Sequence, residues 1–308
     1  MAEFSYIALV TTPETRTFYM AIAEGTFLLG ILIGNTINGF VIDHLGLDTL
    51  AYATAGVSVL PAIVILLLVT DVQGSSCQTS WRDIINIKQF FGPFRTVYKK
   101  RIGFQRALLN WSFVMYSFPF VSLQIFQSAS FLYFVKERGL TMSQYSLFTG
   151  LISAMKSFGG PLVVYLVKRL IRPDQFSFAI GCIISQIVAY TIMSIDAIPA
   201  SMWIGAVLLL TQTSFFALVR ALQTRICLKD EPGQLFAFDA IILCIMSGIT
   251  AIVAKVVYTA TLSFWPGLFL ALCALLYICA MLVTIVVAYY HDTDSTMNIK
   301  LDREGPKT

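Results

Sequence analysis

The sequence predicts an all-α membrane protein, a polytopic helical bundle of about eight transmembrane helices. Of its 308 residues, 57% are hydrophobic and only 12% are charged, and the mean hydropathy is +0.77. A water-soluble domain carries about a quarter charged residues, so this chain has too few charges to cover a surface in water. These observations exclude a soluble globular enzyme and indicate that lipid surrounds most of the chain.

Apolar runs of membrane-spanning length recur along the whole chain. A bilayer core about 30 Å thick needs roughly 20 apolar residues per helix. The first run is too long for the apolar part of a signal peptide and has no basic segment before it, so we expect no cleaved leader. The expected spans run from Phe18 to Ile42, Leu50 to Val69, Leu108 to Val135, Ser146 to Val167, Phe176 to Ile195, Met202 to Leu222, Leu235 to Val257 and Trp265 to Tyr290.

Basic residues alternate between the connections. Sixteen of the 21 lysines and arginines fall in one alternating set of segments, and only Lys136 and Arg138 fall in the other. Because Lys and Arg are retained on the cytosolic side, we expect both termini to be cytosolic. Two spans precede a long basic connection and six follow it. The even number of spans disfavours a seven-helix receptor, although that alternative would return if one span were lost or merged.

Motifs for catalysis and metal binding are missing from the sequence. It contains no CxxC pair, HExxH motif or Cys/His cluster, so we expect no metal site. It also contains no nucleotide-binding loop, nucleophile elbow or paired catalytic carboxylates. We therefore expect neither an enzyme nor a cofactor, and no nucleic acid among the partners. Five of the six cysteines lie in or beside apolar stretches, where a thiol packs as a small hydrophobe.

Lys156 lies deep in its span, about ten residues after the start of the span and roughly 18 Å from its cytosolic end at helical rise. A charge in hydrocarbon needs a partner, a watery cavity or a route to the interface, and snorkelling hardly reaches that far. Two interpretations stay open. Lys156 either forms a buried pair that holds two helices together, or faces a cavity and helps to bind a substrate or an ion.

Glu24 and Arg220 lie at similar depths on oppositely directed helices, and either could snorkel to the interface. Alternatively, Glu24 in a poorly hydrated site would bind and release a proton near neutral pH, which suits proton-coupled transport. Arg220 keeps its charge, so it would pair with such a carboxylate or bind an anionic substrate. Asp239 and Lys255 lie near opposite ends of one span, where we expect both to snorkel.

Uncharged polar residues form stripes on two spans, since positions 7, 11 and 14 apart share one helix face. Such stripes face protein or water, so they form interhelical hydrogen bonds or line a translocation cavity. Gly30 and Gly34 form a small-xxx-small pair that indicates close helix packing. The stripes comprise Glu24, Asn35 and Asn38 on the first span, and Asn110, Ser117, Gln124 and Ser128 on the third.

Three strings carry a more specific signal. SYIALVTTPETRTFYMAIAEG, at residues 5–25, resembles the segment joining helices four and five in the proton-coupled folate transporter family, solute carrier family 46, within the major facilitator superfamily. GGPLVVYLVKR, at 159–169, resembles the second copy of the superfamily's glycine and basic loop motif. RALQTRICLKDEPGQLFAFDA, at 220–240, resembles the family's stretch between helices ten and eleven.

This resemblance implies a domain organisation in which the eight spans correspond to family helices five to twelve, and helices one to four have no counterpart. Residues 1–70 would form the last two helices of an incomplete N-terminal transporter half, and residues 71–106 the basic cytosolic loop between halves. Residues 107–290 would form the six-helix C-terminal half. Residues 291–308, which lack apolar periodicity, would form a disordered cytosolic tail.

The resemblance also implies roles for two residues. The family's helix-five carboxylate, implicated in proton coupling, falls on Glu24, and its helix-ten basic residue, linked to proton and substrate binding, falls on Arg220. The chain departs from the family pattern at Leu9, where an acidic residue is usual, and at Tyr19, where a basic one is usual. The family's coupling histidines have no evident counterpart.

The sequence therefore predicts proton-coupled symport of folate-like or other organic anions in a multi-pass protein of the plasma membrane or lysosome. The expected partners are the anion, protons and the bilayer, with homo- or hetero-oligomers left open. The alternative is a non-transporting membrane interaction protein that pairs with a full-length relative. The predicted proton-coupling residue is Glu24, and the predicted substrate-binding residues are Arg220, Lys156, Asn35, Asn38, Ser117 and Gln124.

Overall fold

The computed structural model describes residues 2–12, 15–45, 47–68, 91–101, 103–171, 174–195, 200–227, 231–262 and 265–304. All regular secondary structure in these ranges is helical. The elements are α1 (Ala2–Val10), α2 (Arg16–Leu45), α3 (Leu47–Leu68), α6 (Gly92–Tyr98), α7 (Gln105–Leu132), the π-helical η1 (Tyr133–Glu137), α8 (Met142–Leu170), α9 (Gln175–Met193), α10 (Ser201–Leu208), the 3₁₀-helical η2 (Leu209–Thr211), α11 (Gln212–Ile226), α12 (Pro232–Thr261) and α13 (Leu268–Glu304).

Seven helical stretches among the described residues are long and apolar enough to cross a membrane. They coincide with seven of the eight expected spans, and the predicted class of a polytopic helical bundle is confirmed. The other expected span, Leu50–Val69, coincides with α3, many of whose side chains lie outside the described part. The seven stretches are Arg16–Gly34, Gln105–Glu137, Gln144–Leu170, Gln175–Met193, Ser201–Ile226, Pro232–Thr261 and Leu268–Thr293.

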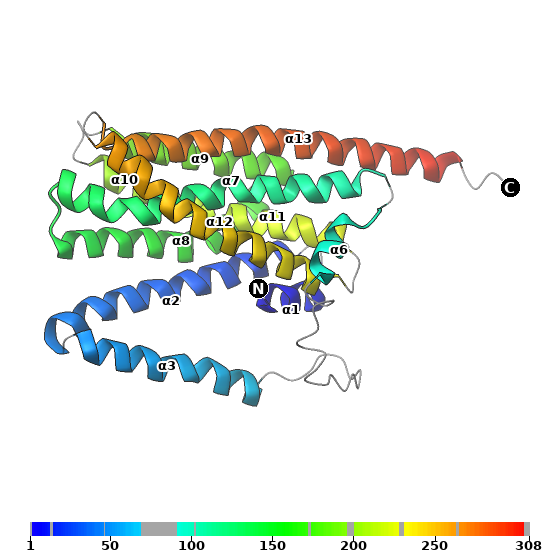
Figure 1. Cartoon of the computed structure of the whole chain (residues 1–308). Helices are drawn as coiled ribbons and strands as arrows, with labels where there is room; N and C mark the ends of the chain where they lie inside the picture. Colours follow the sequence, from blue (N-terminus) through cyan, green and yellow to red (C-terminus); the bar gives the residue numbers. More distant parts are fainter. Residues whose placement is uncertain are drawn as a thin grey trace.

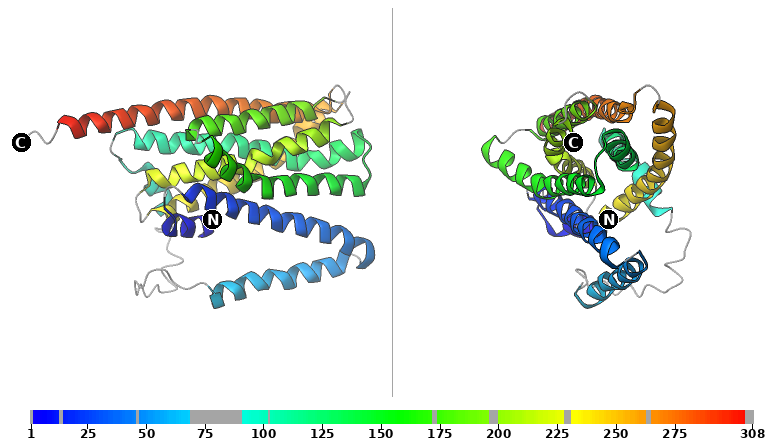
Figure 2. Two further views of the ribbon diagram at one scale, coloured as in Figure 1. Left: turned by 180° about the vertical axis from the view of Figure 1, so that it is seen from behind. Right: turned by 90° about the vertical axis from the view of Figure 1, so that its left-hand side faces the viewer.

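The helices from α7 to α13 pack side by side, and α2 lies along α8 and α11. Helix α3 folds back from α2 on the side away from this bundle (Figures 1 and 2). Helices α1 and α6 lie at the end where α8 and α11 finish, which we call the basic end. The junctions between α7 and α8, α9 and α10, and α12 and α13 lie at the opposite, far end. The alternation of basic segments therefore corresponds to two ends of one bundle.

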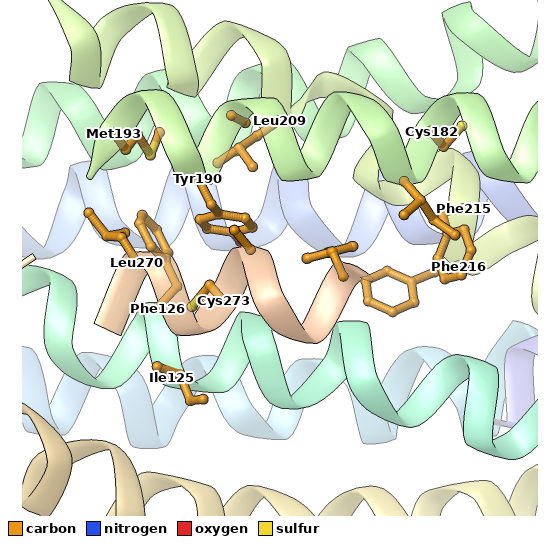
Figure 3. Close-up of a cluster of buried hydrophobic side chains, with 14 of the residues drawn as sticks. Ile125, Phe126, Cys182, Tyr190, Met193, Leu209, Phe215, Phe216, Leu270 and Cys273 are labelled. Carbon is orange, nitrogen blue, oxygen red and sulfur yellow. The ribbon is translucent and has the colours of Figure 1, made fainter. Parts of the chain in front are cut away.

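The core of the bundle lies where α7, α9, α11 and α13 meet. Figure 3 shows Tyr190 and Met193 of α9 facing Phe126 of α7 and Cys273 of α13. Tyr190, Met193 and Cys273 have no exposed surface, and Phe126 is 4% exposed. Burial of this many aromatic and aliphatic side chains fixes the relative positions of the four helices.

Helix α8 packs closely against α2 and α11 because glycines lie at both contacts. A Cβ atom on Gly25 would come within 2.5 Å of the Ser157 carbonyl oxygen, and one on Gly160 within 2.5 Å of Thr213 Oγ1. Gly30 and Gly34 were the expected packing pair, but a Cβ atom on either would meet nothing within 4 Å among the described residues. The described residues give that expectation no support, because spacing alone does not show which face of α2 meets α8.

The span from Ser201 to Ile226 is interrupted by the 3₁₀ segment η2. Side chains of α9 bond to this interruption. Ser185 Oγ donates to the Leu208 carbonyl at 2.9 Å, and Gln186 Nε2 donates to Thr211 Oγ1 at 2.8 Å. These bonds satisfy polar groups at the break, so the irregular backbone is tolerated inside the bundle.

Helix α13 continues to Glu304, beyond Tyr290, where the sequence predicts the last span to end and a disordered tail to begin. Residues 291–304 contain neither proline nor glycine, so nothing in this stretch breaks the helix. Residues 71–90 of the predicted basic loop lie outside the described part, and α6 occupies residues 92–98 of the loop. The division into two transporter halves stays a prediction.

Candidate functional site

A cavity of about 520 Å³ lies between α1, α2, α7, α8, α11 and α12. Apolar side chains cover much of its wall, among them Phe27, Ile31 and Phe216. Polar and ionisable groups from five helices interrupt this apolar surface. They are Glu3, Glu24, Tyr116, Gln127, Ser130, Tyr145, Thr149, Ser153, Lys156, Gln212, Thr213 and Arg220.

An ion pair between Arg220 of α11 and Glu24 of α2 lies at the basic-end side of this cavity. The Arg220 side chain is 5% exposed and that of Glu24 is 13% exposed. The guanidinium also donates through Nη2 to the Tyr116 hydroxyl at 2.6 Å. Its central carbon lies 3.9 Å from the centroid of the Phe4 ring, a cation–π contact. Four helices therefore hold one arginine in place.

Lys156 enters the same cavity from α8 and is only 5% exposed. Two hydrogen bonds fix its height in the bundle. Thr213 Oγ1 donates to the Lys156 carbonyl at 2.5 Å, and Ser157 Oγ donates to the Gly25 carbonyl at 2.6 Å. The second bond places Lys156 level with Glu24. Among the described residues no carboxylate lies within ion-pairing distance of its ammonium, so the buried-pair interpretation has no support.

Asp239 was expected to reach the interface, but it is 2% exposed, so that expectation was wrong. The basic end of α12 is covered by α1, where the Phe4 and Phe236 rings lie 6.0 Å apart. Distance from a helix end predicts the depth of a side chain but not whether a neighbouring element covers it. Lys255, on the same helix, is exposed, and whether it reaches the interface stays a prediction.

The predicted polar stripe on α7 does not line the cavity. Ser117 Oγ donates to the Phe113 carbonyl within α7 at 2.8 Å. Gln124 Nε2 donates to Ser247 Oγ of α12 at 2.7 Å, which is the interhelical alternative. Whether Ser117 or Gln124 contacts a substrate stays a prediction without support from the cavity.

Helix α7 presents a neighbouring face to the cavity, with Tyr116, Gln127 and Ser130. Tyr116 was not among the predicted site residues, because aromatic residues count as apolar in a span, although a phenol is a hydrogen-bonding group. Gln127 could have been predicted as a site residue, because it is a polar residue near the middle of a span. The predicted ligands Asn35 and Asn38 lie in α2 outside the residues whose side chains are described.

The site combines a buried carboxylate, two buried cations, a phenol and an apolar wall. Such a set can bind an anion and exchange a proton, since a carboxylate paired with arginine changes the charge of the site when it is protonated. No group of three or more His, Cys, Asp or Glu side chains in the described ranges could hold a metal ion.

The family model described as Major Facilitator Superfamily matches residues 2–224. The chain belongs to the major facilitator superfamily. The matched range contains Glu24, Lys156 and Arg220, so these charges lie within the superfamily fold. As a major facilitator protein, the chain is an integral multi-pass membrane protein of a class that moves small molecules across membranes. No curated protein matches the chain, and the closer resemblance to solute carrier family 46 stays a prediction.

Proposed function

We propose that the protein is a proton-coupled symporter of folate-like or other organic anions. The observation that carries this proposal is that one cavity holds both the Glu24–Arg220 ion pair and Lys156, a buried cation without a carboxylate partner in the described residues. A buried lone cation is costly, and an anionic ligand would compensate it.

The charges of the cavity supply a coupling mechanism. While Glu24 is ionised, it neutralises Arg220, and Lys156 alone attracts an anion. When Glu24 takes up a proton, Arg220 loses its partner and becomes a second cation for the substrate. Proton and anion therefore favour the binding of each other, because the effect of one ligand on the other is reciprocal.

The size and the walls of the cavity support an organic anion as substrate. A volume of about 520 Å³ suits a drug-sized molecule. Aromatic rings can stack on a flat heterocycle, and hydroxyl and amide groups can bind its polar edge. The rings on the wall are Phe4, Phe27, Tyr116, Phe120, Phe126, Tyr145 and Phe216. Both the plasma membrane and the lysosome fit this proposal, since each can separate solutions of different pH.

Uptake of a radiolabelled folate-class anion into proteoliposomes, driven by an inward proton gradient, tests the proposal. Glu24→Gln should abolish the response to the gradient, because the variant cannot take up the coupled proton. Arg220→Ala should reduce uptake at least tenfold through loss of a charge-assisted contact worth about 1.5–3 kcal/mol. Lys255→Gln, at an exposed lysine of α12, is the control and should transport like the wild type.

Transport by Glu24→Gln and Arg220→Ala at the wild-type level would overturn these assignments. A correctly folded chain that moves no anion, and that co-purifies with a full-length relative, would instead support the non-transporting alternative.

A further inference from the structure

One face of α12 is directed toward the ion pair. Phe236 contacts Phe4, which stacks under the Arg220 guanidinium, and Leu243 lines the cavity. Asp239 lies three residues after Phe236 and four before Leu243, so all three share this face. The carboxylate of Asp239 interacts electrostatically with both Arg220 and Glu24, and the interaction with Arg220 is the larger. Arg220 therefore interacts with two carboxylates, Glu24 on α2 and the buried Asp239 on α12.

The structure leaves complementary polar atoms without partners in this region. Asp239 Oδ2 and Arg220 Nε are both buried, and neither has a hydrogen-bond partner in the described part of the chain. Buried polar groups are nearly always satisfied, so each such atom calls for an explanation. An oxygen that only accepts and an N–H that only donates satisfy each other if the guanidinium turns toward α12.

We propose that Asp239 is the second partner of Arg220 and holds its guanidinium after Glu24 takes up a proton and before the anion arrives. This inference rests on the proposed function for its place in a transport cycle. Without a second carboxylate, protonation of Glu24 would leave a lone arginine in an apolar site, which is strongly unfavourable. Asp239 removes that cost, so Glu24 can accept the proton first.

The charges around Glu24, Asp239 and Arg220 are consistent with a change of the partner of Arg220 from Glu24 to Asp239. Among the described residues, Glu24 interacts electrostatically with Arg220 and Glu3, and Asp239 with Arg220 and Glu24. Arg220 is influenced by Tyr116, Glu24 and Asp239. Arg220 is thus the cation that the two carboxylates share. When it turns to α12, the direct bond between α11 and α2 is lost, which links proton uptake to separation of these helices.

A double-mutant cycle on the purified full chain in detergent at neutral pH tests the inference. The thermal midpoint is measured for Glu24→Gln, Asp239→Asn and the double variant. Each single variant should lose little stability, because the remaining carboxylate still pairs with Arg220. The double variant should lose clearly more than the sum of the two single losses. The excess should vanish in an Arg220→Gln background, since no cation is left to compensate.

Additive losses would overturn the inference, since independent sites add. If the double variant does not fold, recovery of folding on adding Arg220→Gln supports the inference, and no recovery overturns it. Glu24→Gln combined with Glu231→Gln is the matched control and should be additive, because Glu231 pairs with Arg101 at 2.7 Å. The cycle needs no substrate, so its failure is distinct from absent proton-driven uptake, which would overturn the proposed function.

Discussion

At the scale of single residues, Lys156 has opposite effects on stability and on function. Its ammonium lies in a wall that is mainly apolar, and the hydrogen bonds around it use the backbone carbonyl of Lys156 and the hydroxyl of Ser157. The charge itself therefore gains little from the folded protein. Such a group is retained where a ligand uses it, as ionisable residues in membrane spans commonly are.

Replacing this lysine by an apolar residue of similar length should therefore stabilise the protein and weaken substrate binding. We expect Lys156→Met to raise the free energy of unfolding by on the order of 1 kcal/mol, since a buried unpaired charge is removed. The half-saturating anion concentration should rise about tenfold or more. Thermal denaturation and uptake kinetics measure the two effects, and a lower thermal midpoint would show that Lys156 has a stabilising partner.

Cys227 lies between α11 and α12, outside the spans, and its burial lowers the reactivity of its thiol. Burial raises the pKa of its thiol to about 11, although Arg101 nearby opposes the rise. Only the thiolate reacts with maleimide, so Cys227 should be labelled slowly at neutral pH. The rate should increase about tenfold per pH unit up to about pH 11. A variant that keeps only this cysteine makes the measurement, and a rate that levels off below pH 9 would contradict it.

At the scale of elements, the position of α8 determines the shape of the site. Ser157 of α8 donates a hydrogen bond to α2. On the other side of α8, the Lys156 carbonyl accepts from Thr213 of α11, and the Gly160 carbonyl accepts from Ser214 of α11 at 3.0 Å. Glycine at the contacts allows the backbones to approach closely. These bonds hold Lys156 level with Glu24, so the depth of the charged group depends on packing some distance from the charges.

Two glycines of α2 should respond in opposite ways to the same substitution. Gly25→Ala would force a Cβ atom against the Ser157 backbone, so we expect a loss of about 1–3 kcal/mol and displacement of α8. In Gly30→Ala the new Cβ atom meets no described atom within 4 Å, so we expect stability to stay unchanged or to rise by up to about 1 kcal/mol through helix propensity. Thermal denaturation of the two variants tests this prediction. Equal losses of stability in both variants would mean that α2 does not pack against α8 at Gly25.

At the scale of the whole molecule, the basic end is closed by bonds between segments far apart in the sequence. Arg16 Nη1 donates to Thr224 Oγ1 of α11 at 3.3 Å, and Arg16 Nη2 donates to the Ala8 carbonyl of α1 at 2.9 Å. One arginine thereby connects α1, α2 and α11. A movement that separates α2 from α11 at this end must break the bond between Arg16 and Thr224.

Removing that arginine should favour opening at the basic end. We expect spin labels at Tyr19 of α2 and at Arg225 of α11 to move apart in Arg16→Gln, because the bonds to Thr224 and Ala8 are lost. Pulsed electron paramagnetic resonance measures the distance distribution with and without the substitution. An unchanged distribution would show that packing alone keeps this end closed. Arg169→Gln, whose guanidinium bonds Tyr165 within α8, is the matched control.

Much of the architecture was predictable from the sequence, because lipid imposes a minimum length on apolar runs and the basic residues mark one end of the bundle. The depths of Glu24 and Arg220 were predictable for the same reason, and the structure pairs them. Asp239 and Tyr116 were not predictable as members of the site. Periodicity relates residues on one helix, but it does not give the rotation of α7 or α12 relative to its neighbours.

The short 3₁₀ segment at Leu209–Thr211 interrupts the α-helical span that carries Arg220. On its far side, Arg138 ties the ends of α9 and α10 together through the Met193 carbonyl and Ser201 Oγ. On its near side, α11 carries the guanidinium toward the basic end. A change in the bend at this segment would move Arg220 relative to Glu24 while the ends of α9 and α10 stay connected through Arg138.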